Sequence, residues 1–263
     1  MSSTNPTAFD AFAPDYDATF THTRLGQMLR PRVWRHLSAA FAPGQHVLEL
    51  ACGTGEDAVW LAQQGVRVTA TDGSAEMVAK AKAKAKAEAE VIVEQVSLQD
   101  IIAGHFEQVF DGVYSNFGGL NTIDDWRPLA KALAKIVRPG GKVVLVPMGP
   151  FCPWEILWHL GHGQVKTAFR RFGGQAIARI GGAGIPIWYP PARRLQADFS
   201  PWFRHLRTES LELWTPPSYL GHLVDRWPGF FERLNRFEAK TAHITKGWGD
   251  HYICILEKLI ADS

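Results

Sequence analysis

The sequence predicts an α/β fold built on a mostly parallel sheet, and three observations lead to this prediction. Short apolar runs alternate with helix-forming stretches between residues 44 and 148, a glycine turn follows the first run, and an acidic residue ends the second. Alternating strands and helices predict parallel strands joined by right-handed crossovers. Because ligands of such sheets bind beyond the carboxyl ends of the strands, we expect the functional residues at that edge.

The stretch from His46 to Ala58 joins a predicted strand to a turn and to the start of a helix. Its first residues form an apolar run, as expected of a parallel strand that is covered on both faces. Gly53 and Gly55 allow a tight turn and leave no Cβ between the backbone and a ligand. A helix that starts near Glu56 would direct its free N–H groups toward that ligand.

The second predicted strand ends in Asp72, about 20 residues after the first glycine, where nucleotide-binding folds place a ribose-binding carboxylate. The turn and this carboxylate predict an adenosine-type cofactor. Residues 53–58 also satisfy the dinucleotide pattern G-x-G-x-x-G/A, which alone is weak evidence. Two features disfavour NAD: Glu49 would repel a pyrophosphate and attract a cationic ligand, and about 45 residues of mostly helical character precede the first strand.

The remaining elements follow the same plan. Residues 7–41 are expected to form a helical cap in which Pro31 begins a second segment. Residues 79–90 alternate Ala with Lys and Glu, and these strong helix formers predict a helix. Further strands are expected at 91–96, 108–115, 142–148, 207–214 and 250–257, the last antiparallel, and further helices at 126–137 and within 218–239.

Five ordered segments resemble the motifs of class I S-adenosylmethionine-dependent methyltransferases of the small-molecule type, similar to the ubiquinone and menaquinone biosynthesis branch. They resemble, in turn, motif I, the acidic loop after strand two, the adenine-contacting turn, strand four with the loop beneath the reactive methyl, and the turn into strand five. The segments are Val47–Gly55, Thr71–Met77, Val96–Ile101, Phe110–Asn121 and Arg138–Val146.

The resemblance implies a Rossmann-like, seven-stranded, mostly parallel sheet with helices on both faces, an N-terminal helical cap and a lid inserted after strand five. It implies one methyltransferase domain over residues 1–263. Within it we expect the cap at 1–43, the cofactor-binding core at 44–148, the lid at 149–200 and the C-terminal strands and helices at 201–263.

The resemblance also implies which residues bind S-adenosyl-L-methionine. Asp72 would accept hydrogen bonds from both ribose hydroxyls, and an acidic residue that the family often has is replaced here by Ser97. Tyr16 would touch the methionine end or would simply pack. The methionine end would be held by Glu49, Leu50, Ala51, Gly53 and Gly55, adenine by Gly73, Met77, Ser97 and Leu98, and the floor near the methyl would be Ser115, Asn116 and Phe117.

The stretch after residue 148 changes in composition. Seven of the ten tryptophans lie beyond residue 150, which favours a pocket for an apolar or aromatic acceptor or, equally, ordinary packing. Residues 156–197 carry six cations and no Asp or Glu, so this part could attract a carboxylate, a phosphate or an anionic membrane, or be a solvated face. His159, His162 and His222 lie in predicted lid segments, and we assign no catalytic residue.

Composition bounds the partners. A net charge of +2 gives no general affinity for nucleic acid, no stretch is long and apolar enough to span a bilayer, and the start of the chain lacks a signal pattern. The three cysteines are unclustered, which favours reduced thiols in the cytoplasm and argues against a metal site. We expect a monomer or homodimer that acts on a small-molecule acceptor, either apolar or aromatic or bearing a carboxylate.

The function predicted is methyl transfer from S-adenosylmethionine to a small molecule, at O or N first, by in-line displacement. Most of the acceleration can come from positioning, so a general base is optional. Two alternatives remain at this point: an NAD-dependent oxidoreductase, and a non-catalytic protein that binds S-adenosylmethionine.

Overall fold

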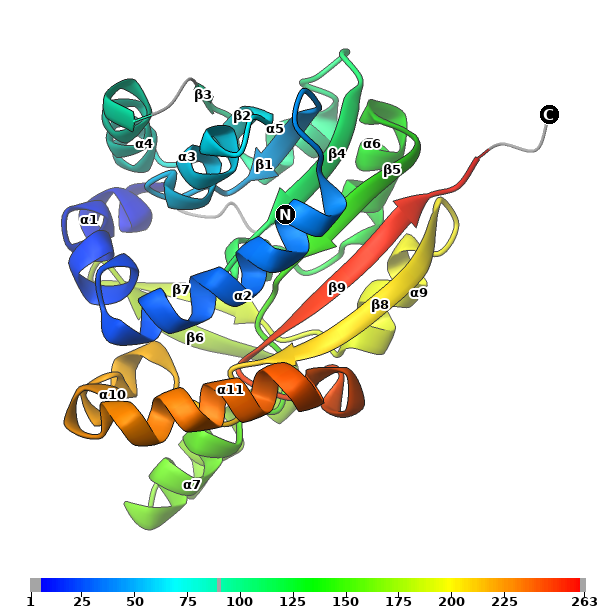
Figure 1. Ribbon diagram of the computed structural model, residues 1–263. Helices are drawn as coiled ribbons and strands as arrows, with labels where there is room; N and C mark the ends of the chain where they lie inside the picture. The colour runs from blue at the N-terminus through cyan, green and yellow to red at the C-terminus, as the bar shows by residue number, and fades with distance from the viewer. Residues whose placement is uncertain (1–5, 89–90, 261–263) are drawn as a thin grey trace.

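The computed structural model describes residues 6–88 and 91–260, which form a central sheet with helices on both faces. The sheet has seven strands in the order β3-β2-β1-β4-β5-β9-β8. β1 to β5 run parallel, and β9 enters antiparallel between β5 and β8 (Figure 1). The strands are β1 His46–Leu50, β2 Arg67–Asp72, β3 Val91–Gln95, β4 Phe110–Ser115, β5 Val137–Leu145, β8 Phe203–Leu211 and β9 His251–Lys258. The predicted seven-stranded, mostly parallel sheet is confirmed.

Two apolar cores lie on the two faces of the sheet because side chains alternate along each strand. Val47 of β1 packs into one core and Leu48 into the other. The register places Glu49 beside Ala70 of β2 and Tyr114 of β4, in the middle of the sheet. Helices on the first face are α2 Arg24–Ala40, α3 Glu56–Gln63, α4 Ala75–Glu88 and α11 Pro228–Thr245, and on the second α5 Leu98–Ala103, α6 Arg127–Ile136 and α9 Ala192–Phe199.

The N-terminal cap consists of α1 Pro6–Tyr16, a π-helical turn η1 Asp17–Thr21, and α2. The predicted break at Pro31 is wrong, because α2 continues through it and begins instead after Thr23, whose side chain accepts from Gly26 N at 3.1 Å. An N-cap of this kind satisfies one of the free donors of the first turn. The alternating Ala/Lys stretch is helical as predicted, with Ala81 and Ala85 buried and Lys82 and Lys86 exposed.

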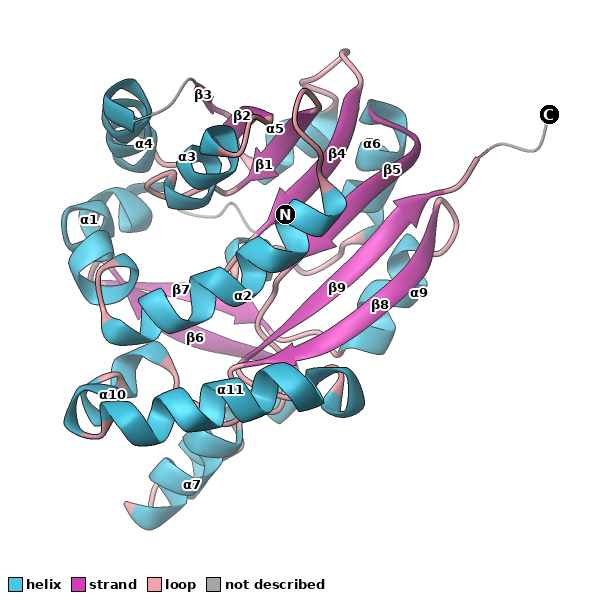
Figure 2. Cartoon of the chain, viewed as in Figure 1, coloured by secondary structure: helices cyan, strands magenta, loops and turns pink. Residues whose placement is uncertain are grey.

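The segment after β5 contains helices and a β-hairpin (Figure 2). The helical part is α7 Pro153–Gly161, α8 Val165–Ala168 and η3 Arg170–Gly173; the hairpin is β6 Gln175–Ile180 and β7 Ala183–Trp188. Gly181 and Gly182, with φ of +54° and +82°, form its two-residue turn, a conformation that favours glycine at both positions. The hairpin is absent from the sequence prediction, because its strands do not alternate apolar and polar residues in a regular way.

The C-terminal part adds η4 Ser218–Leu220 and α10 His222–Arg226 before α11, and a short turn η2 Gly119–Thr122 follows β4. Within residues 6–88 and 91–260, no helix combines the length and apolarity needed to cross a bilayer.

Candidate functional site

A cavity of about 210 Å³ lies at the carboxyl ends of β1, β2 and β4, where the sequence places the functional residues. The sheet edge forms its floor, α1 contributes Phe9 and Tyr16, and the β6–β7 hairpin contributes Ile180 and Ile187. The segment inserted after β5 therefore covers the cavity, as expected of a lid.

The glycine turn brings backbone to the cavity wall. Ala51, Gly53 and Gly55 all have positive φ, at 52°, 55° and 77°. Ala51 and Gly53 line the cavity, while Gly55 caps α3 and faces α4, where a Cβ would come within 2.9 Å of the Ala81 Cβ. Gly53 thus lies at the cavity, whereas Gly55 allows α3 to pack closely on α4.

Asp72 ends β2 with its carboxylate at the cavity. One oxygen accepts from Gly53 N and the other from Ser74 N, both at 2.9 Å. Burial raises the pKa of Asp72 to about 6, although the two backbone donors counteract part of that effect. The same bonds fix the carboxylate against the turn and leave each oxygen a further lone pair for a ligand hydroxyl.

A mostly apolar corner follows Asp72. Gly73, Met77, Val96 and Leu98 line it together with Ser97. Ser97 caps α5: its hydroxyl donates to Asp100 Oδ2 at 2.6 Å, and Asp100 N donates back at 3.2 Å. Ser97 thus pairs with the carboxylate of Asp100, three residues later, as part of the helix cap.

The cap is tied to the glycine turn and to α4 by polar contacts. Thr54 Oγ1 donates to Asp17 at 2.6 Å, and Lys84 bridges Asp17 and Glu56 at 3.2 and 2.8 Å. The ring of Tyr16 lies over Gly53, and burial raises the pKa of its phenol to about 12. Tyr16 therefore stays protonated and forms part of the cavity wall.

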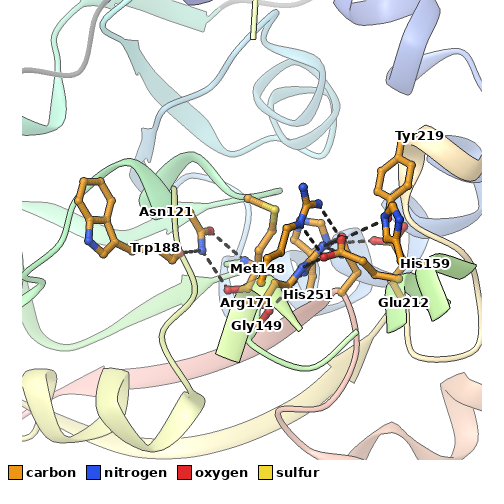
Figure 3. Close-up of polar contacts among 12 residues, drawn as sticks. Asn121, Met148, Gly149, His159, Arg171, Trp188, Glu212, Tyr219 and His251 are labelled. Carbon is orange, nitrogen blue, oxygen red and sulfur yellow. Dashed lines mark hydrogen bonds and ion pairs between the residues drawn. The ribbon is translucent and has the colours of Figure 1, made fainter. Parts of the chain in front are cut away.

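The opposite end of the cavity is lined by Asn116, Phe117, Met148 and the two hairpin isoleucines. Asn121, fully buried on η2, holds this wall together (Figure 3). Its amide donates to Met148 O at 3.0 Å and to Trp188 O at 2.5 Å, and its oxygen accepts from Met148 N at 2.9 Å. One side chain thus joins the β4 loop, the β5 loop and the end of the hairpin.

A buried charge network beneath the floor was missed by sequence reasoning. Asp57, in the first turn of α3, accepts from Arg30 at 2.7 Å, from Trp34 at 2.7 Å and from Asn116 at 3.0 Å. The Arg30 guanidinium lies 5.2 Å from the centre of the Phe117 ring, at cation–π distance. Asp57 falls inside the glycine motif, but no local pattern indicates which distant arginine it meets.

Four predicted residues do not line the cavity. Leu50 and Ser115 are buried, and the Ser115 hydroxyl donates to Leu50 O at 2.9 Å, joining β4 to β1. Gly55 packs on α4. Glu49 is only 2 % exposed, and burial, followed by the nearby Asp57 charge, raises its pKa well above its usual range. The argument that an ionised Glu49 selects a cation needs correction, because desolvation favours the neutral acid; Asp72 is the carboxylate on the wall.

The basic stretch of the lid also needs correction. Arg170 and Arg171 both bind Glu155, at 2.8 Å each, and Arg171 also binds Asp250 at 2.5 Å. Glu155 and Asp250 lie outside residues 156–197, the segment that carries no Asp or Glu. Arg170 and Arg171 therefore form half-buried and buried ion pairs and are not part of a free basic surface.

The three lid histidines lie away from the cavity. His162 and His222 are exposed, His159 is half-buried, and none of them is part of the lining. His159 instead contacts Gln164, with its Nδ1 at 2.6 Å from the amide oxygen. They offer no base to a ligand in the cavity.

His251, at the start of β9, belongs to the same cluster as Arg171. Its Nδ1 lies 2.9 Å from Glu212 and 3.0 Å from Asp250, and its ring packs on Phe117 at 5.8 Å. Burial alone would lower the pKa of His251, but the Asp250 charge and the hydrogen bonds outweigh it and raise the pKa to about 9. Glu212, Asp250 and His251 could hold a metal ion by distance, yet Arg171 and a protonated His251 already supply the positive charge.

The cavity fits an adenosine-type cofactor with a cationic end. Asp72 is the only charged side chain on the described lining, and a ribose hydroxyl could donate to it. Asn116 belongs to the lining, and its Oδ1 is buried without a hydrogen-bond partner among the described residues. An unpaired buried acceptor is costly, and a ligand donor such as an ammonium would satisfy it.

The fold and this cavity are similar to those of class I S-adenosylmethionine-dependent methyltransferases, and the function that they support is methyl transfer with S-adenosylmethionine as the cofactor. Comparison with known proteins agrees: residues 47–141 match a family model described as a methyltransferase domain. A demethylmenaquinone methyltransferase from Mycobacterium tuberculosis is 27% identical over 226 residues, covering 84% of this chain and 82% of that protein.

Solved structures share the fold. A methyltransferase from Methanosarcina mazei aligns with a TM-score of 0.60 at 16% identity, covering 86% of this chain and 97% of that one. A structure of DhpI in complex with SAH aligns with a TM-score of 0.56 at 23% identity, covering 77% and 88%. Neither the oxidoreductase nor the non-catalytic alternative is supported.

Proposed function

We propose that the protein methylates an electron-rich aromatic small molecule, of the hydroquinone or phenol kind, held between the β4 loop and the β6–β7 hairpin. The observation that carries this proposal is the lining of the acceptor end. Phe117, Met148, Ile180 and Ile187 are apolar, and no Lys, Arg or His stands among the described residues of the lining. A carboxylate-bearing acceptor, the other class expected, would find no cation there.

The chemistry of the acceptor follows from the same lining. When bound, S-adenosylmethionine supplies an electrophilic methyl group. Among the described residues no imidazole or lysine reaches the cavity to remove a proton, and burial keeps the Tyr16 phenol protonated by raising its pKa. An acceptor that is nucleophilic as a neutral molecule, such as the electron-rich ring carbon of a hydroquinone, suits this wall. The methyl–sulfur bond breaks as the new bond forms, S-adenosylhomocysteine leaves, the acceptor proton passes to solvent, and positioning supplies the acceleration. The demethylmenaquinone methyltransferase relative, by its name, acts on demethylmenaquinone.

In the proposed arrangement Asp72 accepts from the ribose hydroxyls. Glu49 would accept a hydrogen bond from the ammonium of the cofactor only in its ionised form, which the neighbouring cation would favour. The remaining contacts follow the lining from end to end. Gly73, Met77, Val96 and Leu98 enclose adenine with Ser97 at its edge, Tyr16, Ala51 and Gly53 lie along the methionine end, and Asn116 and Phe117 form the floor beneath the methyl.

The test is transfer of labelled methyl from S-adenosylmethionine to a panel that contains reduced menadione, simple phenols and aromatic carboxylic acids. We expect labelled product and S-adenosylhomocysteine with the hydroquinone, and no product with the carboxylic acids. Ile187→Lys should raise KM for the hydroquinone while cofactor affinity stays constant, and Val109→Lys, at an exposed site away from the cavity, serves as the control. Preference for carboxylic acids would reject the proposal.

The one-domain organisation and the cytoplasmic location stay predictions, as does the choice between monomer and homodimer. Analytical ultracentrifugation of the full chain tests the last of these.

A further inference from the structure

Helices α7 and α11 lie at the bottom of Figure 1, and they and the segments beside them carry exposed apolar side chains outside the cavity. We call this surface the apolar face and define it by Leu157, Phe172, Phe230, Phe237, Ile244 and Trp248, each more than half exposed. Single exposed apolar residues are normal, but a gathering of them marks an interaction surface.

Aromatic contacts join parts of the apolar face that are far apart in sequence. Phe151 contacts Trp248 at 5.3 Å and Phe172 at 6.5 Å, so the residues after α11 lie beside η3. On the buried side of α11, Phe231 contacts Trp154 of α7 at 5.5 Å, which holds the lid helix against α11.

The outer side of α11 carries an apolar stripe. Phe230, Phe237 and Ile244 follow one another at intervals of seven residues, which places them on one line of the helix. The opposite side of α11 is already used: Phe231 and Glu238 are buried, and the helix packs on β8. The three stripe residues stay more than half exposed, although the Trp214 ring contacts Phe237 at 6.2 Å.

The charge around the stripe is positive. Four cations are exposed on or just after α11, and Glu232 is the one exposed acid among the described residues from 228 to 248. The other acid of α11, Glu238, is buried and pairs with Arg32 at 2.9 Å. Aromatic and aliphatic side chains flanked by cations are the pattern of a helix that lies in a membrane interface. The four cations are Arg233, Arg236, Lys240 and Lys246.

We propose that the apolar face binds the surface of an anionic lipid bilayer, with α11 in the plane of the interface. A second copy of this chain is the poorer occupant, because a symmetric dimer through α11 would set one basic rim against another. Anionic head groups complement the four cations, and the protruding Phe, Ile and Trp side chains reach the acyl boundary. The proposal stands on the surface alone and does not depend on the acceptor.

The test is co-sedimentation of the full chain with phosphatidylcholine vesicles that contain or lack phosphatidylglycerol. We expect binding to the anionic vesicles that weakens with salt, and little binding to the neutral ones. The triple variant Phe230→Ser/Phe237→Ser/Ile244→Ser should bind at least about ten-fold more weakly. The matched control Ile92→Ser/Val109→Ser removes two exposed apolar side chains from elsewhere and should bind like the wild type.

The cations are tested separately. Arg233→Gln, Arg236→Gln and Lys240→Gln should each reduce binding by about five-fold, whereas Lys131→Gln and Lys135→Gln, exposed on α6, should not. Unchanged affinity for S-adenosylhomocysteine, measured by calorimetry, verifies that each variant is folded. Absence of wild-type binding, equal binding to neutral vesicles, or self-association that the triple variant abolishes without any vesicle binding would each overturn the proposal.

Discussion

Replacing Asp72 by Asn should separate cofactor affinity from fold stability. The carboxylate accepts from two backbone N–H groups of the turn and faces the cavity. Its pKa of about 6 means that burial disfavours the ionised form in the folded protein relative to the unfolded chain. The shift from the ordinary value corresponds to roughly 2–3 kcal/mol at pH 7, reduced by the partial access of solvent.

The Asp72→Asn side chain would keep one acceptor oxygen and lose one backbone hydrogen bond, at a cost of about 1–2 kcal/mol. Removing the buried charge offsets that cost. We therefore expect the free energy of unfolding at pH 7 to change by about 1 kcal/mol or less. Affinity for S-adenosylmethionine should nevertheless fall by about ten-fold to a few hundred-fold, because hydrogen bonds to a charged acceptor contribute about 1.5–3 kcal/mol.

The assay combines titration calorimetry with S-adenosylhomocysteine and chemical unfolding at about pH 5 and pH 8. The wild type should lose stability as pH rises from about 4 through 6, since the folded state holds the Asp72 proton longer, and Asp72→Asn should reduce this slope. Unchanged cofactor affinity would refute the ribose assignment. A loss of stability above about 3 kcal/mol would show that the two backbone bonds outweigh the buried charge.

Three further predictions concern the cavity and the residues that support it. Asn121→Ala removes three buried hydrogen bonds and should lower the free energy of unfolding by about 3 kcal/mol or more; urea unfolding measures this, and a loss below about 1 kcal/mol would contradict it. His251, with its pKa raised to about 9, should contribute roughly 3 kcal/mol that is fully present below pH 6.5 and disappears as pH rises through 9; thermal unfolding against pH should show this decline, and His251→Gln should remove it. Gly55→Val should mainly destabilise the fold, because its Cβ would clash with Ala81 at a φ of +77°, whereas Gly53→Val, beside the cavity, should abolish binding of S-adenosylhomocysteine; equal effects of the two variants on binding would contradict this division.

Local sequence patterns are sufficient for the sheet and for one corner of the site. Apolar strands, the glycine turn and Asp72 lie within a short stretch of chain, and parallel topology brings the strand ends to one edge. For this reason the sequence alone predicts a cavity at that edge. Its lining includes the predicted residues Ala51, Gly53, Asp72, Met77, Leu98 and Asn116.

Only the tertiary structure determined which ionisable side chains carry a charge and which of them lie at the cavity. Glu49 and Asp72 are both acids near strand ends, but the register buries Glu49 between β2 and β4 and leaves Asp72 at the cavity. Likewise, Arg171 meets Asp250, which is 79 residues away, and a cap arginine meets the acid of the glycine motif. Desolvation and ion pairing depend on neighbours in space. The sequence alone therefore determined which groups are ionisable. The fold determined which of these groups remain charged and which of them a ligand can reach.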